Sequence, residues 1–406
     1  MLLSIALILM VGMFMGWVCK QLRLPSLLGM ILTGILLGPH ILNMIDGSIL
    51  NISSELRRIA LIIILTRAGL SLDLNDLKKV GRPAILMCFV PACFEILGMV
   101  VLAPRLLGVS VLDAAIIGAV VGAVSPAVIV PKMLKLMDEK YGAEQGIPQL
   151  ILAGASVDDV FVIVMFSAFT GLAQGGTVSP VSFVKIPVSI VTGILVGMII
   201  GIMLAKFFEK VHIRDTAKVI ILLGLSFILV TFEDNYSAII PFASLIAVMC
   251  IGIALQKKRT VVANRLSGKF NKLWVAAEIM LFVLVGATVD LKYVKTAGIA
   301  AVVLIFGVLI FRMIGVFCCL LKTKLKMKER IFCMIAYTPK ATVQAAIGGI
   351  PLSMGLACGN IVLTVAVLAI LITAPVGAFA IDCTYKKLLT KTEYISMYLK
   401  LKEMSS

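Results

Sequence analysis

Two adjacent aspartates, Asp158 and Asp159, lie inside an apolar stretch that runs from about Pro148 to Leu172. That stretch is long enough to cross a bilayer, which takes roughly 20 helical residues. A carboxylate near the middle of a membrane costs ~2.5–3.5 kcal/mol on insertion scales, so two in succession indicate a functional or a pairing role. Neighbours on a helix point about 100° apart, so one can hold a salt bridge while the other faces an aqueous cavity. Adjacent acids also raise each other's proton affinity, and such a group can exchange a proton for a small cation that prefers oxygen ligands.

Four other ionisable residues lie well inside apolar stretches: Arg67, Glu95, Arg312 and Lys340. With the aspartates they make three acids and three bases, a set that can neutralise itself, and buried charges are normally paired. Arg312 cannot lose its proton and is a permanent counter-ion. Arg67 and Glu95 are expected on neighbouring spans and could form an ion pair.

The elements that position these residues are predicted to be membrane helices. Hydrophobic residues make up 61% of the 406 positions and charged residues only 14%, with a mean hydropathy of +1.12. This composition excludes a soluble domain and indicates an all-α polytopic membrane protein. Apolar runs predict about 13 spans, near residues 2–19, 25–45, 56–72, 83–104, 111–134, 148–173, 182–205, 217–232, 238–255, 273–289, 297–321, 331–352 and 358–384.

The distribution of basic residues predicts the orientation of these spans. Of the 37 Lys and Arg residues, three lie well inside spans; with those near span ends counted in the adjoining loops, 28 fall on one side and six on the other. The positive-inside rule then places the N-terminus outside and the C-terminus in the cytoplasm, in a multi-pass protein of the cytoplasmic membrane. The net charge of +16 therefore reports orientation rather than nucleic-acid binding.

Two predicted spans contain a helix breaker near their middle. The fifth has Ser125 before Pro126, and the twelfth has Thr338 and Pro339 before Lys340. Proline removes a backbone donor and disfavours helix at the preceding residue. The two broken spans are seven spans apart, so the pattern predicts two inverted six-helix repeats. Paired interrupted helices point to the central site of a transporter. We expect the first repeat at 1–180, a linker helix at 181–210, the second repeat at 211–385 and a short cytoplasmic tail at 386–406.

Three blocks of the sequence match a known family. GAVSPAVIVPKML, YGAEQGIPQLILAGASVDDV and YTPKATVQAAIG occur in this order, and the chain resembles the NHA branch of the monovalent cation:proton antiporters over nearly its whole length. The resemblance implies a sodium/proton antiporter-like fold whose mobile core carries two crossed, unwound helices, assembled as a homodimer in membrane lipid. It also implies exchange of Na⁺ or Li⁺ for H⁺, with no other cofactor.

The resemblance also implies roles for individual residues. Asp159 matches the carboxylate that binds the cation or the proton, and Asp158 its neighbour that pairs with a base. The remaining matches are Arg312 as that base, Lys340 as the lysine of the broken helix, Arg67 and Glu95 as a buried ion pair, and Ser125, Pro126, Ser156, Thr338 and Pro339 as residues lining the site. Relatives with an electrogenic cycle often carry lysine where Arg312 stands, whereas electroneutral relatives have an Asn-Asp pair. The two signals conflict, so the stoichiometry stays open.

The sequence therefore predicts a secondary antiporter rather than an enzyme. An intramembrane aspartyl protease needs two carboxylates on different elements that face each other, and adjacent acids on one helix cannot do this. A sodium-coupled organic-solute symporter of similar fold, a K⁺/H⁺ exchanger and a channel are the alternatives. A symporter would be favoured by many polar side chains around the site, and few are present.

Overall fold

The computed structural model describes residues 1–22, 24–72, 81–174, 180–211, 213–236, 241–289 and 291–391. These residues form helices joined by short connections, with one isolated bridge between Tyr141 and Lys391. Within them, nine helices are long and apolar enough to cross a membrane. The prediction of an all-α polytopic membrane protein is confirmed. Of the other predicted spans, 25–45 and 238–255 correspond to shorter helices, 331–352 to an interrupted one and 56–72 to the helix Ser53–Ser71, which carries several charged residues. The count of 13 therefore stays a prediction.

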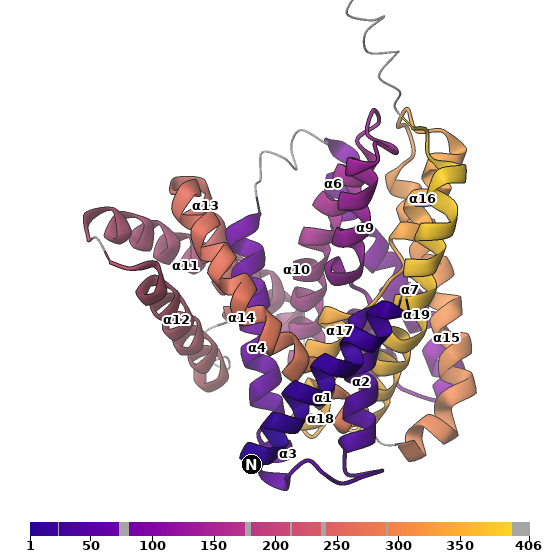
Figure 1. The fold of residues 1–406 in the computed structure, drawn as a ribbon, viewed down its shortest axis with the longest axis horizontal. Coiled ribbons are helices and arrows are strands. Elements are labelled where there is room, and N and C mark those ends of the chain that lie inside the picture. The colour runs from indigo at the N-terminus through magenta and orange to yellow at the C-terminus, as the bar shows by residue number, and fades with distance from the viewer. Residues whose placement is uncertain are drawn as a thin grey trace, which may run out of the picture.

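One group of helices, called here the frame, occupies the left and centre of Figure 1. Within it α11 packs on α13, α13 and α14 pack on α4, and α2 packs on both α1 and α14. Its members are α1 (Leu2–Gln21), α2 (Ser26–Leu37), α3 (Gly47–Asn51), α4 (Ser53–Ser71), α11 (Pro180–Lys210), α12 (Asp215–Tyr236), α13 (Ser244–Lys258) and α14 (Thr260–Ala287).

The second group, called here the bundle, occupies the upper centre and the right of Figure 1 and overlaps α1 and α2 of the frame in this view. In it α7 packs on α8 and α15, and α19 packs on α16. Its members are α6 (Arg82–Met87), α7 (Val90–Leu107), α8 (Val111–Val121), α9 (Pro126–Asp138), α10 (Ile147–Gln174), α15 (Leu291–Cys319), α16 (Met327–Ala336), α17 (Thr342–Ile347), α18 (Ile350–Ser353) and α19 (Gly359–Leu388).

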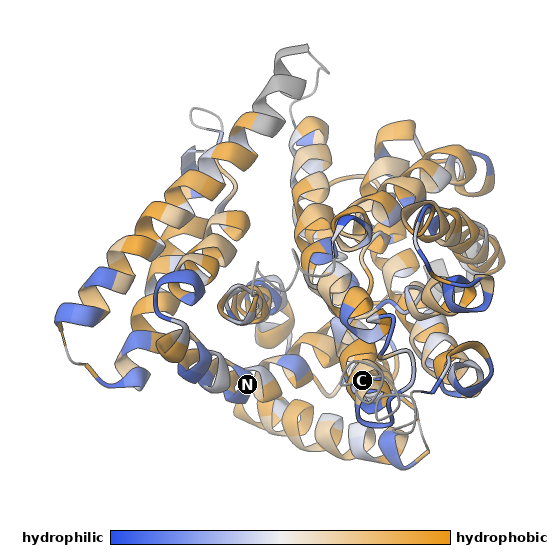
Figure 2. Ribbon diagram, turned by 90° about the horizontal axis from the view of Figure 1, so that it is seen from above, coloured by the Kyte–Doolittle hydropathy of each residue, from blue (hydrophilic) through white to orange (hydrophobic). Residues whose placement is uncertain are grey.

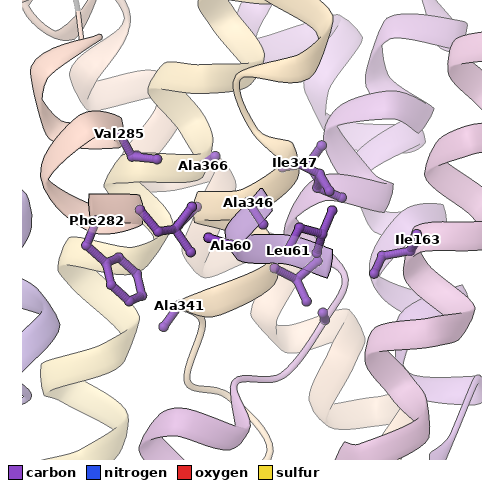
Figure 3. Close-up of a cluster of buried hydrophobic side chains, with 14 of the residues drawn as sticks. Ala60, Leu61, Ile163, Phe282, Val285, Ala341, Ala346, Ile347 and Ala366 are labelled. Carbon is purple, nitrogen blue, oxygen red and sulfur yellow. The ribbon is translucent and has the colours of Figure 1, made fainter. Parts of the chain in front are cut away.

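The frame and the bundle meet along a seam of small and branched apolar side chains. Helix α17 packs against α4 and α14, and α10 approaches α13. Figure 3 shows this seam, with Ala60 and Leu61 of α4 and Phe282 of α14 near Ala346 and Ile347 of α17, all of them buried. Apolar contacts are non-directional, so they hold the two groups together without fixing one relative position of the groups, as hydrogen bonds would.

Large apolar side chains remain exposed around the outside of both groups. Ile220 of α12, Ile299 of α15 and Phe379 of α19 are 69%, 86% and 71% exposed. Figure 2 shows hydrophobic residues over most of the helix surfaces and hydrophilic residues mainly towards helix ends. Soluble monomers rarely expose so much contiguous apolar surface, whereas lipid covers it in a membrane protein.

Helices of the frame approach each other until their backbones touch. A Cβ added at Gly34 of α2 would collide with the carbonyl oxygen of Val283 on α14, and one at Gly69 of α4 would collide with that of Met249 on α13. Small residues at such crossings allow the close van der Waals packing on which helix association in lipid depends. The frame is therefore a tightly packed unit.

The termini of the described chain lie at opposite ends of the molecule in Figure 1, with Met1 at the lower end and the last turns of α19 at the upper end. This arrangement agrees with an odd number of crossings. Which end faces the cytoplasm stays a prediction, as do the boundaries of the two repeats and the linker. One detail of the charge count is wrong: Arg57, counted with the outer loops, lies in α4 and is only 5% exposed.

Candidate functional site

The two interrupted helices meet at their breaks. Helix α8 ends at Val121 and α9 begins at Pro126, while α16 ends at Ala336 and α17 begins at Thr342. Both predicted breaks are confirmed, because each proline starts or precedes a new helical segment as its missing N–H requires. The backbone N–H of Ser125 donates to the carbonyl oxygen of Pro339 at 2.8 Å, so the unwound segments are joined directly.

Arg312 of α15 lies between the breaks and is fully buried. Its Nε donates to the carbonyl oxygen of Tyr337 at 2.6 Å, and its Nη1 donates to that of Gly122. These residues are the C-caps of α16 and α8. The C-terminal end of a helix carries orphan carbonyls and partial negative charge, so one cation stabilises both half-helices.

The same guanidinium holds two acids. Its Nη2 lies 2.7 Å from Oδ2 of Asp158, and its Nη1 lies 2.6 Å from Oε2 of Glu95 on α7. Lys340, in the second break, places its Nζ 2.5 Å from the same Glu95 oxygen. All four side chains are buried, with at most 1% exposed. Two carboxylates and two cations have formal charges that cancel, which is the condition under which buried charges are tolerated.

The predicted pair of Arg67 and Glu95 is wrong. Glu95 binds Arg312 and Lys340, whereas Arg67 lies in the frame on α4 and interacts electrostatically with Glu278 of α14. Sequence order placed Arg67 and Glu95 on consecutive spans. In the structure those spans belong to different groups, because α7 packs on α8 and α15 rather than on α4.

Asp158 and Asp159 face different surroundings although they are neighbours on α10. Oδ2 of Asp158 accepts from Arg312 and, at 2.8 Å, from the backbone N–H of Val124 in the first break. Asp159 is turned towards the seam and lines a cavity of about 20 Å³. Its Oδ1 is buried without a hydrogen-bond partner among the described residues.

The cavity beside Asp159 lies where the bundle meets the frame. Its other walls come from α4, α13 and α17 and from the residue after Asp159; they are Leu61, Ile64, Leu65, Ala68, Val160, Met249, Thr342 and Val343. The volume has room for about one water-sized particle. Of the side chains that line it, only those of Asp159 and Thr342 carry oxygen, the ligand atom that alkali cations take.

The remaining predicted residues also lie at the breaks. Ser125 is buried before Pro126, the first residue of α9, and its Oγ has no hydrogen-bond partner among the described residues. The hydroxyl of Thr338 donates to the carbonyl oxygen of Ile335 at 2.8 Å. The side chain of Ser156 lies outside the described residues.

Two residues at the breaks were missed by the sequence reasoning. Thr373 of α19 accepts the backbone N–H of Lys340 at 2.9 Å, and Gln344 of α17 donates to carbonyl oxygens of the first break. Gln344 carried a usable signal, because it is a polar residue in the apolar run ATVQAAIG close to a predicted break. Thr373 carried none, since a lone threonine in an apolar helix usually bonds to its own helix.

Comparisons with known proteins agree with this geometry. The family described as "Sodium/hydrogen exchanger, transmembrane" matches residues 5–387. The chain is 34% identical to sodium/hydrogen exchanger 9B2 of Xenopus tropicalis, over 93% of this chain and 73% of that protein. It is 33% identical to the human protein of the same name, over 91% of this chain and 71% of that protein.

A solved structure has the same fold. The sodium proton antiporter MjNhaP1 from Methanocaldococcus jannaschii superimposes with a TM-score of 0.82, covering 95% of this chain and 97% of that one at 19% identity. This likeness supports the overall fold. Taken with the match over nearly the whole sequence and the 34% identity to an exchanger, it leads to one conclusion. The chain belongs to the sodium/hydrogen exchanger family.

Proposed function

We propose that this protein exchanges Na⁺ or Li⁺ for H⁺ across the membrane, with the cation and the proton competing for Asp159. The observation that carries the proposal is the contrast within the charged set. Glu95, Asp158, Arg312 and Lys340 neutralise one another, whereas Asp159 has no ion-pair partner among the described residues and lines a cavity. A buried carboxylate without a counter-ion is costly, so it gains from binding either a proton or a metal cation.

The charge balance also supports one proton per cation. Because the four paired residues cancel formally, the site is neutral whenever Asp159 holds one H⁺ or one Na⁺. Lys340 lies 2.5 Å from Glu95 and belongs to this neutral group, so the simplest scheme assigns the transported proton to Asp159 alone. We therefore propose electroneutral exchange, which predicts transport that does not respond to membrane potential.

The position of Asp159 supports alternating access. The carboxylate lies at the seam, and its cavity has walls from both the frame and the bundle. A relative movement of the two groups would open the cavity to one side of the membrane and close it to the other, which is how many transporters work around a central site. The cavity of about 20 Å³ is too small for an organic solute, which disfavours the symporter alternative.

The test is the pH dependence of transport in proteoliposomes. Competition predicts that the apparent KM for Na⁺ rises about tenfold for each pH unit below the point at which Asp159 is half protonated, with Vmax unchanged. Asp159→Asn should abolish Na⁺-dependent proton flux without loss of folded protein. An apparent KM independent of pH, or normal exchange by that variant, would contradict the proposal.

Matched experiments address the remaining expectations. Pulses of Na⁺, Li⁺ and K⁺ separate a sodium exchanger from a potassium exchanger. Flux measured at imposed potentials of opposite sign tests electroneutrality, since a net charge per cycle would change the driving force by ~2.3 kcal/mol per 100 mV. The N-terminus outside, the C-terminus in the cytoplasm and the homodimer also stay proposals, to be tested by labelling and cross-linking in the membrane.

A further inference from the structure

We propose that Gln344 is a positioning residue for the ion site, acting through the unwound segment of the first broken helix. Gln344 lies on α17 and is 1% exposed. Its Nε2 donates to the carbonyl oxygen of Val121 at 3.1 Å and to that of Ala123 at 2.9 Å. The inference rests on the proposed function, because it assigns to Gln344 the task of holding the site in its working geometry.

The break after α8 creates the need for such a residue. The last carbonyls of a helix have no partner in their own helix, and a buried carbonyl left unpaired is destabilising. Arg312 donates a hydrogen bond to the carbonyl oxygen of Gly122, and Gln344 donates to those of Val121 and Ala123 on either side of it. Three successive carbonyl oxygens are thus held by two side chains from other helices.

The next two residues of the segment are also held from outside. The N–H of Val124 donates to Asp158, and the N–H of Ser125 donates to Pro339. Hence every residue from Val121 to Ser125 has a backbone hydrogen bond to another element. A shift of Ala123 would move Val124 and weaken its bond to Asp158, whose neighbour on α10 is the proposed ion-binding carboxylate.

The chemistry of this position favours an amide. A glutamine amide has two N–H donors, enough for both carbonyls, and carries no charge. An ionised glutamate has only acceptor atoms and could not bond the two carbonyl oxygens. A lysine or arginine would add an unbalanced cation to a group of side chains whose charges already cancel. Gln344 also follows Thr342 and Val343, which line the Asp159 cavity. It therefore links the wall of that cavity to the first break.

The experiment combines transport with amide hydrogen exchange. Gln344→Met keeps the length of the side chain and removes both donors. We expect the apparent KM for Na⁺ to rise about tenfold with a smaller change in Vmax, as for the loss of one or two buried hydrogen bonds that orient a site. We also expect the amides of Val124 and Ser125 to exchange about tenfold faster, while those of α13 keep their wild-type rates.

Gln256→Met is the matched control, because Gln256 is another buried glutamine, on α13 in the frame. It should leave both readouts unchanged. Should Gln344→Met not fold, Gln344→Asn tests the same point, since its shorter amide cannot reach both carbonyls. Wild-type KM and wild-type exchange at Val124 and Ser125 in a folded variant would overturn the inference.

The two proposals fail in different ways. If the wild-type protein shows no Na⁺-dependent proton flux, the proposed function fails, and hydrogen exchange at Val124 and Ser125 still tests Gln344. If wild-type flux is present and Gln344→Met matches it in KM and exchange rate, only the positioning role fails. A uniform increase in exchange over the whole protein would indicate a general loss of stability and would also count against the role.

Discussion

The two sides of α10 place the same kind of side chain, an aspartate, in opposite surroundings. Towards the bundle, Asp158 is fully buried, accepts two hydrogen bonds and belongs to a neutral group of four charged residues. Towards the seam, Asp159 borders a cavity and forms no salt bridge with the described residues. The difference comes from one step along a helix, about 100° of rotation.

This contrast separates structural charge from exchangeable charge. On the bundle side, Asp158 and Arg312 form hydrogen bonds to backbone groups at the two helix breaks, so these charged side chains are fixed in place. Both aspartates have one buried oxygen without a hydrogen-bond partner among the described residues, but Asp158 has a salt bridge with Arg312, whereas Asp159 borders a cavity in which a ligand can come and go. We expect substitutions on the bundle side to change stability first and those on the seam side to change transport first.

The largest effect on stability is expected for Arg312→Ala. It would leave Asp158 without its cation, Glu95 with only Lys340, and the carbonyl oxygens of Gly122 and Tyr337 without a donor. Removing one partner of a buried pair typically costs ~3–5 kcal/mol. Thermal melting in detergent should show a large drop for this variant and none for Asp159→Asn. Equal melting temperatures would remove the contrast between the two sides.

A smaller loss is expected for Lys340→Met. Glu95 would keep Arg312 as a partner, so only one of its two cations is lost. We expect a loss of about 1–3 kcal/mol, the usual cost of a missing hydrogen bond to a buried charged group. The ranking of melting temperatures, with Lys340→Met above Arg312→Ala, is the measurement. The reverse ranking would show that Lys340 rather than Arg312 balances the acids.

On the seam side, Ala68→Val adds two methyl groups to a wall of the Asp159 cavity. Because the cavity has room for about one water-sized particle, we expect an apparent KM for Na⁺ about tenfold higher, equivalent to ~1.4 kcal/mol. Flux assays against Na⁺ concentration measure this, and the melting temperature should stay within error of wild type. An unchanged KM would show that the cation does not use this space.

The smallest effect is expected at an exposed ion pair of the bundle. Lys132 of α9 pairs with Asp382 of α19, and their side chains are 24% and 38% exposed. Exposed pairs contribute ~0.2–1 kcal/mol, so Asp382→Ala should lower the melting temperature slightly and leave transport unchanged. A loss as large as that of Arg312→Ala would mean that burial does not decide the value of these pairs.

Much of the architecture could be predicted from composition and from two prolines. Apolar length predicts membrane helices, and Pro126 and Pro339 predict interrupted ones, because both depend on local chemistry. The separate roles of Asp158 and Asp159 also follow from helix geometry. Charge types in the apolar runs identified all four members of the neutral group before the fold was known.

The partners within that group could not be predicted in the same way. Pairing Glu95 with Arg67 assumed that consecutive spans pack together, and the structure assigns them to different groups. Nothing local distinguishes Arg312 from Arg67 as the partner of Glu95, since the choice depends on which helices the chain brings together far apart in sequence. Gln344 and Thr373 were missed for a related reason. Their partners are backbone N–H and C=O groups, which almost every residue has. Such groups are free to bond a side chain only where a helix ends.

The backbone contacts at Gly34 and Gly69 have a mechanical consequence. Helices that already touch through their main chains cannot be pressed closer, so under the proposed alternating access the frame would be the rigid part against which the bundle moves. Enlarging either glycine should push two of its helices apart and tilt the surface on which α17 rests. If the proposed movement takes place, such a change would alter its extent while every proposed ion-binding atom stays intact.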